Sequence, residues 1–297
     1  MSFELSLFSV SYAGLWNQEC LNLQDFVARA KLLGYRTVML MGKRPHLSPL
    51  DTDDQALDEL RNCLTQHDVQ CAAIAGYTDF SVQPAAEVPF IEMQLDYVTS
   101  LCRLASGLNA TYVRVFTAYE REGSSPTIAW NRVVTCLQEC ADRAANYGIT
   151  LAVQNHHDVA LDSHALLELL NDVDRSNVKL SFDAWSPALR GEPLYEISRQ
   201  MAPHTVITTN ADYIRVPRYR YCPELVNYQR EQPDFVRAVP FGEGFIDYEA
   251  FFTGLQEGGF NGLANYEMCS PIRGGGAREN LDDYARGYLE RMSQHST

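Results

Sequence analysis

The sequence predicts an α/β fold, a single (β/α)8 TIM barrel, from three observations. A unit recurs in which an amphipathic run, a Gly or Asn break and a short apolar run rich in β-branched residues follow one another, as in FVARAKLLGYRTVMLM. Eight such apolar runs occur, mostly at intervals that a helix would fill. Polar side chains gather where the later runs end. Parallel strands joined by helical crossovers close into a barrel that carries its active site at the carboxyl ends of the strands.

Each predicted element follows from a local pattern. Apolar residues three and four apart predict helices, and short apolar runs bounded by Gly or Asn predict buried strands. An open doubly wound sheet is the alternative, but it would place a G-x-G-x-x-G fingerprint after the first strand, where the chain reads FSVSYAGLWNQE. We therefore predict a barrel whose strands begin near Glu4, Thr37, Gln70, Tyr112, Thr150, Val178, Thr205 and Gly262.

Composition limits the class of protein. The 297 residues contain no low-complexity linker, so we predict one domain, 1–297, with a long loop after the seventh strand at about 213–240. A net charge of -14 argues against a nucleic-acid partner. We also expect no membrane span, no signal peptide and hence a cytoplasmic location. The eight cysteines are expected to be reduced rather than to form a disulfide scaffold.

Four neighbouring strands are predicted to end in polar side chains. Because side chains alternate along a strand, Gln154 shares a face with His156, Asn210 with Asp212, and Asn265 with Glu267. Asp183 ends the sixth strand. Carboxylate, amide and imidazole groups that converge in this way suit a divalent ion such as Mn²⁺, Mg²⁺ or Co²⁺.

The motifs GITLAVQNHHD, VKLSFDAW, TTNADY and GEGFIDYEAFFTGLQEGGFNGLANYEM resemble the xylose isomerase-like TIM-barrel superfamily of sugar isomerases and epimerases. The resemblance implies one divalent metal ion held by Glu, Asp, His and Glu at the ends of strands five to eight. Asp183 and Glu267 match this pattern, but Gln154 stands at the first Glu. At the His position we expect Asn210 or Thr209, with His156 as a further candidate. Mn²⁺ is the preferred ion, and Mg²⁺, Co²⁺ or Zn²⁺ are alternatives.

The departure at Gln154 changes the expected mechanism. In the family's epimerases, the resemblance assigns the glutamates of strands five and eight as paired bases. The neutral amide of Gln154 cannot accept a proton. We therefore expect Glu267 to act as metal ligand and base, with His156 as a second proton carrier that titrates near neutrality. His157 is expected to point away from the pocket or to lie on the loop, and it is also a candidate for substrate binding.

Further candidates for substrate contact lie near the predicted strand ends. Arg114 lies within the fourth strand, where a charged side chain requires a polar pocket or a partner. Arg215 belongs to the Tyr- and Arg-rich segment after the seventh strand, and Arg273 precedes three glycines that are able to cradle a phosphate. Lys43 follows the second strand and is within reach of the pocket mouth. The candidate substrate-binding set is His157, Trp185, Asp212, Arg215, Arg114 and Arg273.

These features together predict an enzyme. The favoured function is a metal-dependent isomerase or epimerase of a keto or aldo sugar, which removes a proton next to a polarised carbonyl. A lyase, either a dehydratase or a glycoside-eliminating enzyme on an oxidised sugar or cyclitol, is the alternative. A non-catalytic sugar-binding barrel or a subunit of a complex is a further one. The substrate is expected to be a small carbohydrate, and the resemblance suggests a homo-oligomer, either a dimer or a tetramer.

Overall fold

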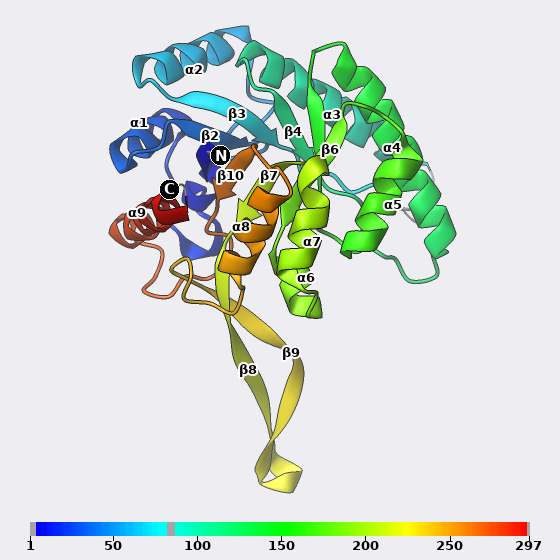
Figure 1. Ribbon diagram of the computed structural model, residues 1–297, viewed down its shortest axis with the longest axis vertical. Coiled ribbons are helices and arrows are strands. Elements are labelled where there is room, and N and C mark those ends of the chain that lie inside the picture. The colour runs from blue at the N-terminus through cyan, green and yellow to red at the C-terminus, as the bar shows by residue number, and fades with distance from the viewer. Residues whose placement is uncertain (1–3, 82–86, 296–297) are drawn as a thin grey trace.

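The computed structural model describes residues 4–81 and 87–295, in which eight parallel strands close into a barrel (Figure 1). The order around the barrel is β1-β10-β7-β6-β5-β4-β3-β2. The predicted (β/α)8 barrel is confirmed, and seven strands begin at the predicted residue, while β10 begins one residue later. The strands are β1 (Glu4–Phe8), β2 (Thr37–Met41), β3 (Gln70–Ala75), β4 (Tyr112–Val115), β5 (Thr150–Gln154), β6 (Val178–Asp183), β7 (Thr205–Asn210) and β10 (Leu263–Tyr266).

Helices surround the barrel and connect its strands (Figure 1). Asn22, Asp53 and Asp162 each accept a hydrogen bond from a backbone N–H three residues further on, which satisfies a free donor at a helix start. The helices are α1 (Leu23–Leu33), α2 (Asp54–Gln66), α3 (Phe90–Gly107), α4 (Pro126–Ala145), α5 (Ser163–Val173), α6 (Trp185–Arg190), α7 (Leu194–Met201), α8 (Tyr248–Glu257) and α9 (Arg278–His295), with 3-10 turns η1 (Ser9–Tyr12), η2 (Leu15–Asn17), η3 (Ala202–His204) and η4 (Pro223–Leu225).

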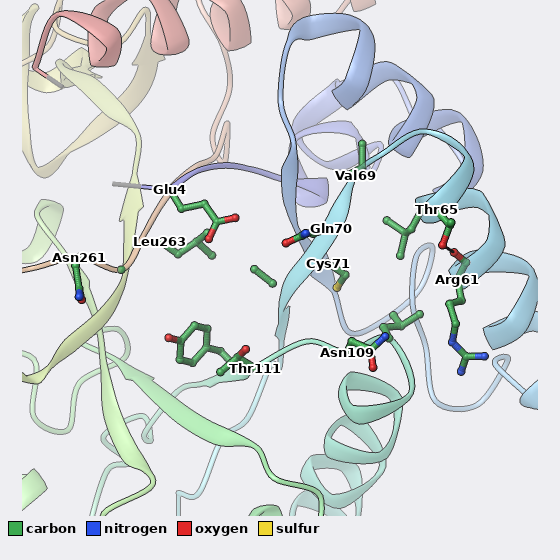
Figure 2. A pocket seen from close by; sticks show the side chains of 15 residues that line it. Glu4, Arg61, Thr65, Val69, Gln70, Cys71, Asn109, Thr111, Asn261 and Leu263 are labelled. Carbon is green, nitrogen blue, oxygen red and sulfur yellow. Dashed lines mark hydrogen bonds between the residues drawn. The ribbon is translucent and has the colours of Figure 1, made fainter. Parts of the chain in front are cut away.

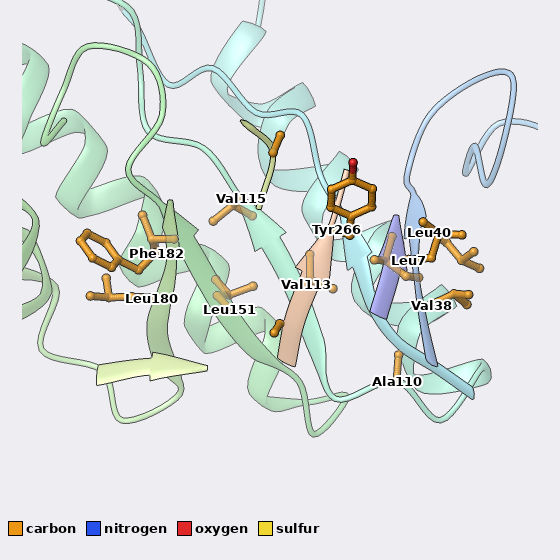
Figure 3. Packing of buried hydrophobic residues seen from close by; sticks show 14 of the residues in the cluster. Leu7, Val38, Leu40, Ala110, Val113, Val115, Leu151, Leu180, Phe182 and Tyr266 are labelled. Carbon is orange, nitrogen blue, oxygen red and sulfur yellow. The ribbon is translucent and has the colours of Figure 1, made fainter. Parts of the chain in front are cut away.

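The core has an outer and an inner layer, because successive strand residues face opposite sides of the sheet. Figure 3 shows Val113, Leu151 and Leu180 of three neighbouring strands in the outer cluster, which packs against the helices. Each fully buried side chain of this size contributes about 1.5 to 3 kcal/mol. Met39 and Ile207 belong to a smaller cluster formed by the alternate positions inside the barrel. At the carboxyl ends of the strands, these inward positions become polar.

The segment predicted as a long loop is instead an antiparallel hairpin (residues 212–239), formed by β8 (Asp212–Cys222) and β9 (Asn227–Val239). It leaves the barrel after β7 and reaches far beyond the helices (Figure 1). Tyr and Val occur in both strands, and these residues favour extended structure. Pro217 and Pro233 concealed the strand pattern in the sequence. The pairing shifts register near them, which removes the need for their missing N–H groups.

Across the described residues, we find no helix of sufficient length and apolar character to cross a membrane.

Candidate active site

A cavity of about 500 Å³ opens at the carboxyl ends of the barrel strands. Its polar wall contains the predicted residues Gln154, Asp183 and Glu267, which come from β5, β6 and the end of β10. A cavity of this size holds a molecule as large as a monosaccharide. The remaining lining residues include Phe8, Trp16, Lys43, Tyr77, Asp79, Arg114, Phe116, Tyr119, His156, His157, Trp185 and Cys269.

Asp183 is held firmly at the end of β6. Its Oδ2 accepts a hydrogen bond from Gln154 Nε2 at 3.0 Å, and its Oδ1 accepts one from the backbone N–H of Trp185 at 2.8 Å. The side chain of Asn155 holds both backbone groups of Asp183. Asn155 Oδ1 accepts a hydrogen bond from Asp183 N, and Asn155 Nδ2 donates one to Asp183 O. Burial raises the pKa of Asp183 to about 6. Asp183 is therefore mostly ionised at pH 7 and takes up a proton as the pH falls through about 6.

Glu267 is the second carboxylate of the wall. Cys269 donates a hydrogen bond from Sγ to Glu267 Oε1 at 2.9 Å, and the same sulfur lies 2.9 Å from the hydroxyl of Tyr213. Burial, with the charge of Asp183 as a second cause, raises the pKa of Glu267 to about 7. A carboxylate with this pKa is able both to accept and to return a proton at neutral pH.

Arg114 brings a buried positive charge to the same cavity. Its side chain is only 2% exposed, and Nη1 donates to the carbonyl of Gly76 at 2.9 Å. The guanidinium carbon lies 3.9 Å from the ring centre of Phe116, which is a cation–π distance. Arg114 Nε has no hydrogen-bond partner among the described residues. Its charge lowers the pKa of both Asp183 and Glu267, although burial outweighs this effect.

His156 and His157 both line the cavity. Their Nδ1 atoms are 2.9 Å apart, and the ring of His157 stacks on Tyr119 with 3.8 Å between ring centres. His157 lies on the loop after β5, which is one of the two expected alternatives, but it does not point away. Its backbone is left-handed, with φ of 68°, and its ring lines the cavity. The backbone N–H of His157 donates to His156 Nδ1, so a neutral His156 carries its proton on Nε2.

The electrostatic surroundings of the two histidines differ from our prediction. Burial, followed by the charges of His157 and Arg114, lowers the pKa of His156 to about 3. Burial also lowers the pKa of His157 to about 4. His156 is therefore a neutral imidazole near pH 7 and does not titrate there. It is suited to donating a hydrogen bond from Nε2 rather than to carrying a proton as an imidazolium.

Strand β7 does not supply the predicted metal ligand. Asn210 faces outward, where its Nδ2 donates to Thr208 Oγ1 at 3.0 Å and to the hydroxyl of Tyr288 at 3.2 Å. The alternative candidate, Thr209, pairs with Asp183 across the sheet but lies outside the cavity lining, with its hydroxyl 3.4 Å from Ser181. Neither Asn210 nor Asp212 lines the cavity.

Asp212 also has a structural environment rather than a place in the pocket. Its Oδ2 accepts hydrogen bonds from the backbone N–H groups of Gly242 and Gly244, both at 2.8 Å, and its Oδ1 accepts one from Tyr213 N. These bonds attach the loop before α8 to the base of the hairpin. A Cβ atom at Gly244 would collide with the carboxylate of Asp212. Glycine is therefore required at this position.

The structure does not bring the two remaining candidate arginines to the cavity. Arg215 is exposed on β8, with its guanidinium carbon 4.6 Å from the ring centre of Phe245. Arg273 is exposed and forms an ion pair with Glu243. Neither residue lines the cavity. Trp185 does line it, with its ring centre 4.8 Å from that of Tyr213.

Sequence reasoning did not identify several residues of the cavity. Cys269 follows Glu267 by two residues, a spacing that places both on one side of an extended segment and was available as a signal. Tyr77 and Asp79 follow β3, and Phe116 and Tyr119 follow β4. No charge pattern marks these segments, and only their position after a barrel strand would have indicated them.

A second cavity, of about 480 Å³, lies at the amino-terminal ends of the strands. Figure 2 shows Glu4, Gln70, Asn109 and Asn261 around it. The described residues that line it include no histidine and only one carboxylate. Because barrel enzymes perform their chemistry at the carboxyl ends of the strands, we assign the candidate active site to the first cavity.

Oxygen donors suited to a metal ion are present in the first cavity. Among the described residues, no group of three or more His, Cys, Asp and Glu side chains converges as a metal site. The carboxylates of Asp183 and Glu267 nevertheless line one wall with the amide of Gln154, and the charge of Asp183 raises the pKa of Glu267. A cation beside them would remove this repulsion. Two carboxylates and an amide oxygen fit a hard divalent ion such as Mn²⁺ or Mg²⁺.

The protein is thus a closed parallel barrel with a polar cavity at the carboxyl ends of its strands. The chain belongs to the xylose isomerase-like TIM-barrel family, whose model matches residues 27–289. This confirms the family resemblance seen in the sequence. A comparison with curated protein sequences finds no match.

Solved structures of the same fold include proteins of several activities. The xylose isomerase domain protein from Planctomyces limnophilus is 20% identical, with 98% of this chain and 96% of that chain covered and a TM-score of 0.69. D-allulose 3-epimerase from Methylomonas sp., solved with D-allulose, is 16% identical, with 98% and 96% covered and a TM-score of 0.74. A probable 3-DHS dehydratase from Bacillus anthracis is 16% identical, with 99% of both chains covered and a TM-score of 0.72. At sequence identities this low, the comparisons show a shared fold and do not by themselves assign an activity.

Proposed function

We propose that the protein is a divalent-metal-dependent isomerase or epimerase of a keto or aldo sugar, or of a sugar derivative. One observation carries the proposal: the carboxylates of Asp183 and Glu267 line the same cavity as the buried guanidinium of Arg114. Two acidic groups and a fixed positive charge in a cavity of about 500 Å³ suit proton transfer next to a carbonyl of a small polar molecule.

Glu267 is the proposed base. In the metal-free protein its pKa of about 7 leaves about half of these side chains deprotonated at neutral pH, and a bound cation would lower this pKa and increase that fraction. The thiol of Cys269 occupies Oε1, so Oε2 remains to accept the proton from the carbon beside the substrate carbonyl. Gln154 occupies the equivalent position on β5 and has no capacity to accept a proton, so the proton transfer is asymmetric.

His156 and Arg114 are the proposed groups that stabilise the enediolate. A neutral His156 presents an Nε2–H donor, which stabilises negative charge on oxygen without first losing its own proton. Arg114 contributes a full positive charge that is already desolvated in the free protein. Trp185 and Phe116 provide aromatic surfaces against which an apolar sugar face is able to pack.

Asp183, Glu267 and the amide oxygen of Gln154 are the proposed metal ligands, with Mn²⁺ as the preferred ion. A divalent ion bound by them would polarise the substrate carbonyl and acidify the adjacent C–H bond. The side chains that line the cavity determine where this substrate C–H bond lies relative to Glu267. Because Gln154 replaces an anionic ligand, we expect weaker metal binding than three carboxylates would give.

A lyase is the second candidate function, and the asymmetry of the site favours it. Glu267 would remove a proton beside the carbonyl of an oxidised sugar or cyclitol, and the Nε2–H of His156 would assist the departure of a β-leaving group. A carboxylate base and a neutral imidazole donor also suit elimination, in which the base and the acid act on different atoms of the substrate. A probable dehydratase is also among the solved structures with this fold.

We further propose a cytoplasmic enzyme, because all eight cysteines have free thiols in the structure. Free cysteines at this frequency are characteristic of reducing compartments. Several of the thiols are fully buried, which protects them from oxidation.

Exchange of substrate hydrogen with D₂O tests the proposal. Candidate keto sugars and oxidised cyclitols are incubated with the protein and Mn²⁺ in D₂O, and the products are analysed by NMR and mass spectrometry. Deuterium in an isomeric product supports an isomerase or epimerase, and loss of water or of an aglycone supports a lyase. Binding without either outcome supports a sugar-binding barrel or a subunit of a complex instead.

Two variants sharpen this experiment. Glu267→Gln should abolish deuterium incorporation, because the amide is not basic. Glu243→Gln is the matched control, since Glu243 is exposed and paired with Arg273 outside the cavity. Full turnover by the Glu267→Gln protein would exclude Glu267 as the base.

A further inference from the structure

The charged side chains of the first cavity are divided between two parts of its rim. Asp183 and Glu267 lie at the ends of β6 and β10, whereas Lys43 follows β2 and Arg114 lies in β4. The strands β2, β3 and β4 are consecutive around the barrel, and so are β10, β7, β6 and β5. The cavity therefore has an acidic half and a basic half, and a ligand that spans it meets both.

The two cations of the basic half have no acidic partner. Among the described residues, no ion pair includes Lys43 or Arg114. Arg114 donates to the carbonyl of Gly76, but its Nε and the buried hydroxyl of Tyr77 have no hydrogen-bond partner there. A desolvated charge without a counterion is costly, and an anionic ligand supplies the counterion.

The ring of Tyr77 holds both cations on this wall. The ammonium nitrogen of the half-buried Lys43 lies 3.8 Å from the ring centre, and the guanidinium carbon of Arg114 lies 5.0 Å from it. Burial, followed by the charge of Arg114, lowers the pKa of Lys43. Two like charges beside one ring repel each other, and an anion next to both removes the repulsion.

The acids of the cavity do not provide that anion. Asp79 is the one acid among the described lining residues of the basic half, and its Oδ2 already accepts from Arg121 Nη2 at 2.7 Å. Its Oδ1 accepts from the backbone N–H of Ser81 at 3.0 Å. On the acidic half, a divalent ion would match the charges of Asp183 and Glu267. The basic half is therefore the part whose charge a ligand has to match.

The available donors favour a carboxylate over a phosphate group. Phosphate sites in barrels use backbone N–H groups of glycine-rich turns at a helix start. The described residues that line this cavity include no glycine, and the glycine run at 274–276 lies elsewhere. An ammonium group with a guanidinium behind it suits the two oxygens of a carboxylate. A sugar acid with six carbons also has the size that a cavity of about 500 Å³ accepts.

We propose that the ligand of this cavity is a sugar acid, and that Lys43, next to Arg114, binds its carboxylate while the rest of the sugar extends toward Asp183 and Glu267. The inference rests on the proposed function, because it names the substrate class of the same site. The carboxylate orients the sugar on the basic half and is not the group at which Glu267 acts.

Isothermal titration calorimetry of the full-length protein with Mn²⁺ tests the inference. The probes are D-fructose, D-fructuronate and D-fructose 6-phosphate, which differ only at the sixth carbon, and D-glucose, D-glucuronate and D-glucose 6-phosphate form a second series. In at least one series, the acid should bind about tenfold or more tightly than the neutral sugar and more tightly than the phosphate. Raising NaCl from about 0.05 M to about 0.5 M should reduce this preference, because salt screens the half-buried Lys43.

Variants of two neighbouring residues separate the proposed contact from general charge effects. Lys43→Met should lower the ratio of affinities for acid over neutral sugar about fivefold or more, and Lys43→Arg should keep most of it. Arg44→Met is the matched control, since Arg44 is exposed and paired with Asp51 outside the cavity. Its ratio should equal that of the wild type. Thermal unfolding of each variant verifies that the barrel remains folded.

Several results would overturn the inference. These are no preference for the acid in either series, no binding of any probe, tighter binding of the phosphates, or an unchanged ratio in Lys43→Met. The proposed function fails separately. Tight binding of D-fructuronate without hydrogen exchange in D₂O would keep the carboxylate site and remove the isomerase, whereas exchange on D-fructose without preference for the acid would do the reverse.

Discussion

Gln154 donates a hydrogen bond from Nε2 to Oδ2 of Asp183 at 3.0 Å, across the carboxyl ends of β5 and β6. The family resemblance leads us to expect an acid at position 154. The neutral amide found there instead donates a hydrogen bond to the carboxylate of Asp183. The bond stabilises the charged form of Asp183, but burial still raises its pKa to about 6. Replacing Gln154 therefore changes both the charge of the wall and the orientation of Asp183.

The variant Gln154→Glu should bind Mn²⁺ at least about tenfold more tightly than the wild type, because affinity for hard cations rises with the number of anionic ligands. Without metal it should be less stable, since a third acid then faces two buried ones. Isothermal titration calorimetry with MnCl₂ measures the first effect, and thermal unfolding with and without Mn²⁺ measures the second. Gln70→Glu, at the other end of the barrel, is the control. Equal affinities for Mn²⁺ in all three proteins would contradict the proposed metal site.

The variant Arg114→Met should become less stable relative to the wild type as the pH rises. Burial places the folded-state pKa values of Asp183 and Glu267, about 6 and about 7, above their ordinary values, so deprotonation already costs stability as the pH increases. Removing Arg114 raises both values further. We expect an extra loss of about 1 to 2 kcal/mol at pH 8 compared with pH 5. Urea unfolding at the two pH values measures it, and Arg114→Lys should show a smaller loss.

The two histidines make the opposite contribution to the pH dependence. Their folded-state pKa values, about 3 and about 4, lie below the ordinary value, so the unfolded chain binds these protons first. The stability they contribute is present above about pH 6.5 and is lost as the pH falls toward 4. At pH 5, the loss should be about 1 kcal/mol for each histidine, after allowance for partial solvent screening.

The double variant His156→Asn, His157→Asn isolates this effect. It should lose less stability between pH 7.5 and pH 5 than the wild type does, measured by urea unfolding. His164→Asn, which changes an exposed histidine at the start of α5, should follow the wild type. If the double variant followed the wild-type curve as well, His156 and His157 would not be the groups responsible.

Gly244→Ala should reduce the free energy of unfolding by about 2 kcal/mol or more, because the added methyl group would displace the carboxylate of Asp212 from the backbone donors that hold it. Gly287→Ala is the matched control. Gly287 lies within α9 with open space around it, so alanine should be neutral or stabilise the helix by up to about 1 kcal/mol. Chemical denaturation of both variants tests the difference, and equal stabilities would contradict a structural role for Asp212.

The barrel was predictable because each of its strands is marked locally. A helix pattern, a Gly or Asn break and a β-branched run specify a strand start to within one residue, as at Thr150 and Thr205. The hairpin was not predictable in the same way. Its two strands pair only with each other, and Pro217 and Pro233 interrupt the alternating strand pattern in the sequence. Tertiary pairing, rather than local preference, decides such a segment.

The site was predictable to the extent that strand alternation determines direction. Gln154 and His156 were placed together correctly, and both line the cavity. For Asn210 and Asp212, alternation could not predict which side of the barrel the side chains meet, since a one-residue change reverses the direction. The low pKa values of His156 and His157 arise from burial and from Arg114, which lies 42 and 43 residues earlier in the chain. Only the folded arrangement reveals this effect.

Tyr213 belongs to the hairpin and to the active site at once. It is the second residue of β8, its ring packs on Trp185, and its hydroxyl contacts the thiol that donates to Glu267. A displacement of the hairpin base would therefore move the hydroxyl that contacts Cys269 and, with it, the thiol that donates to Glu267.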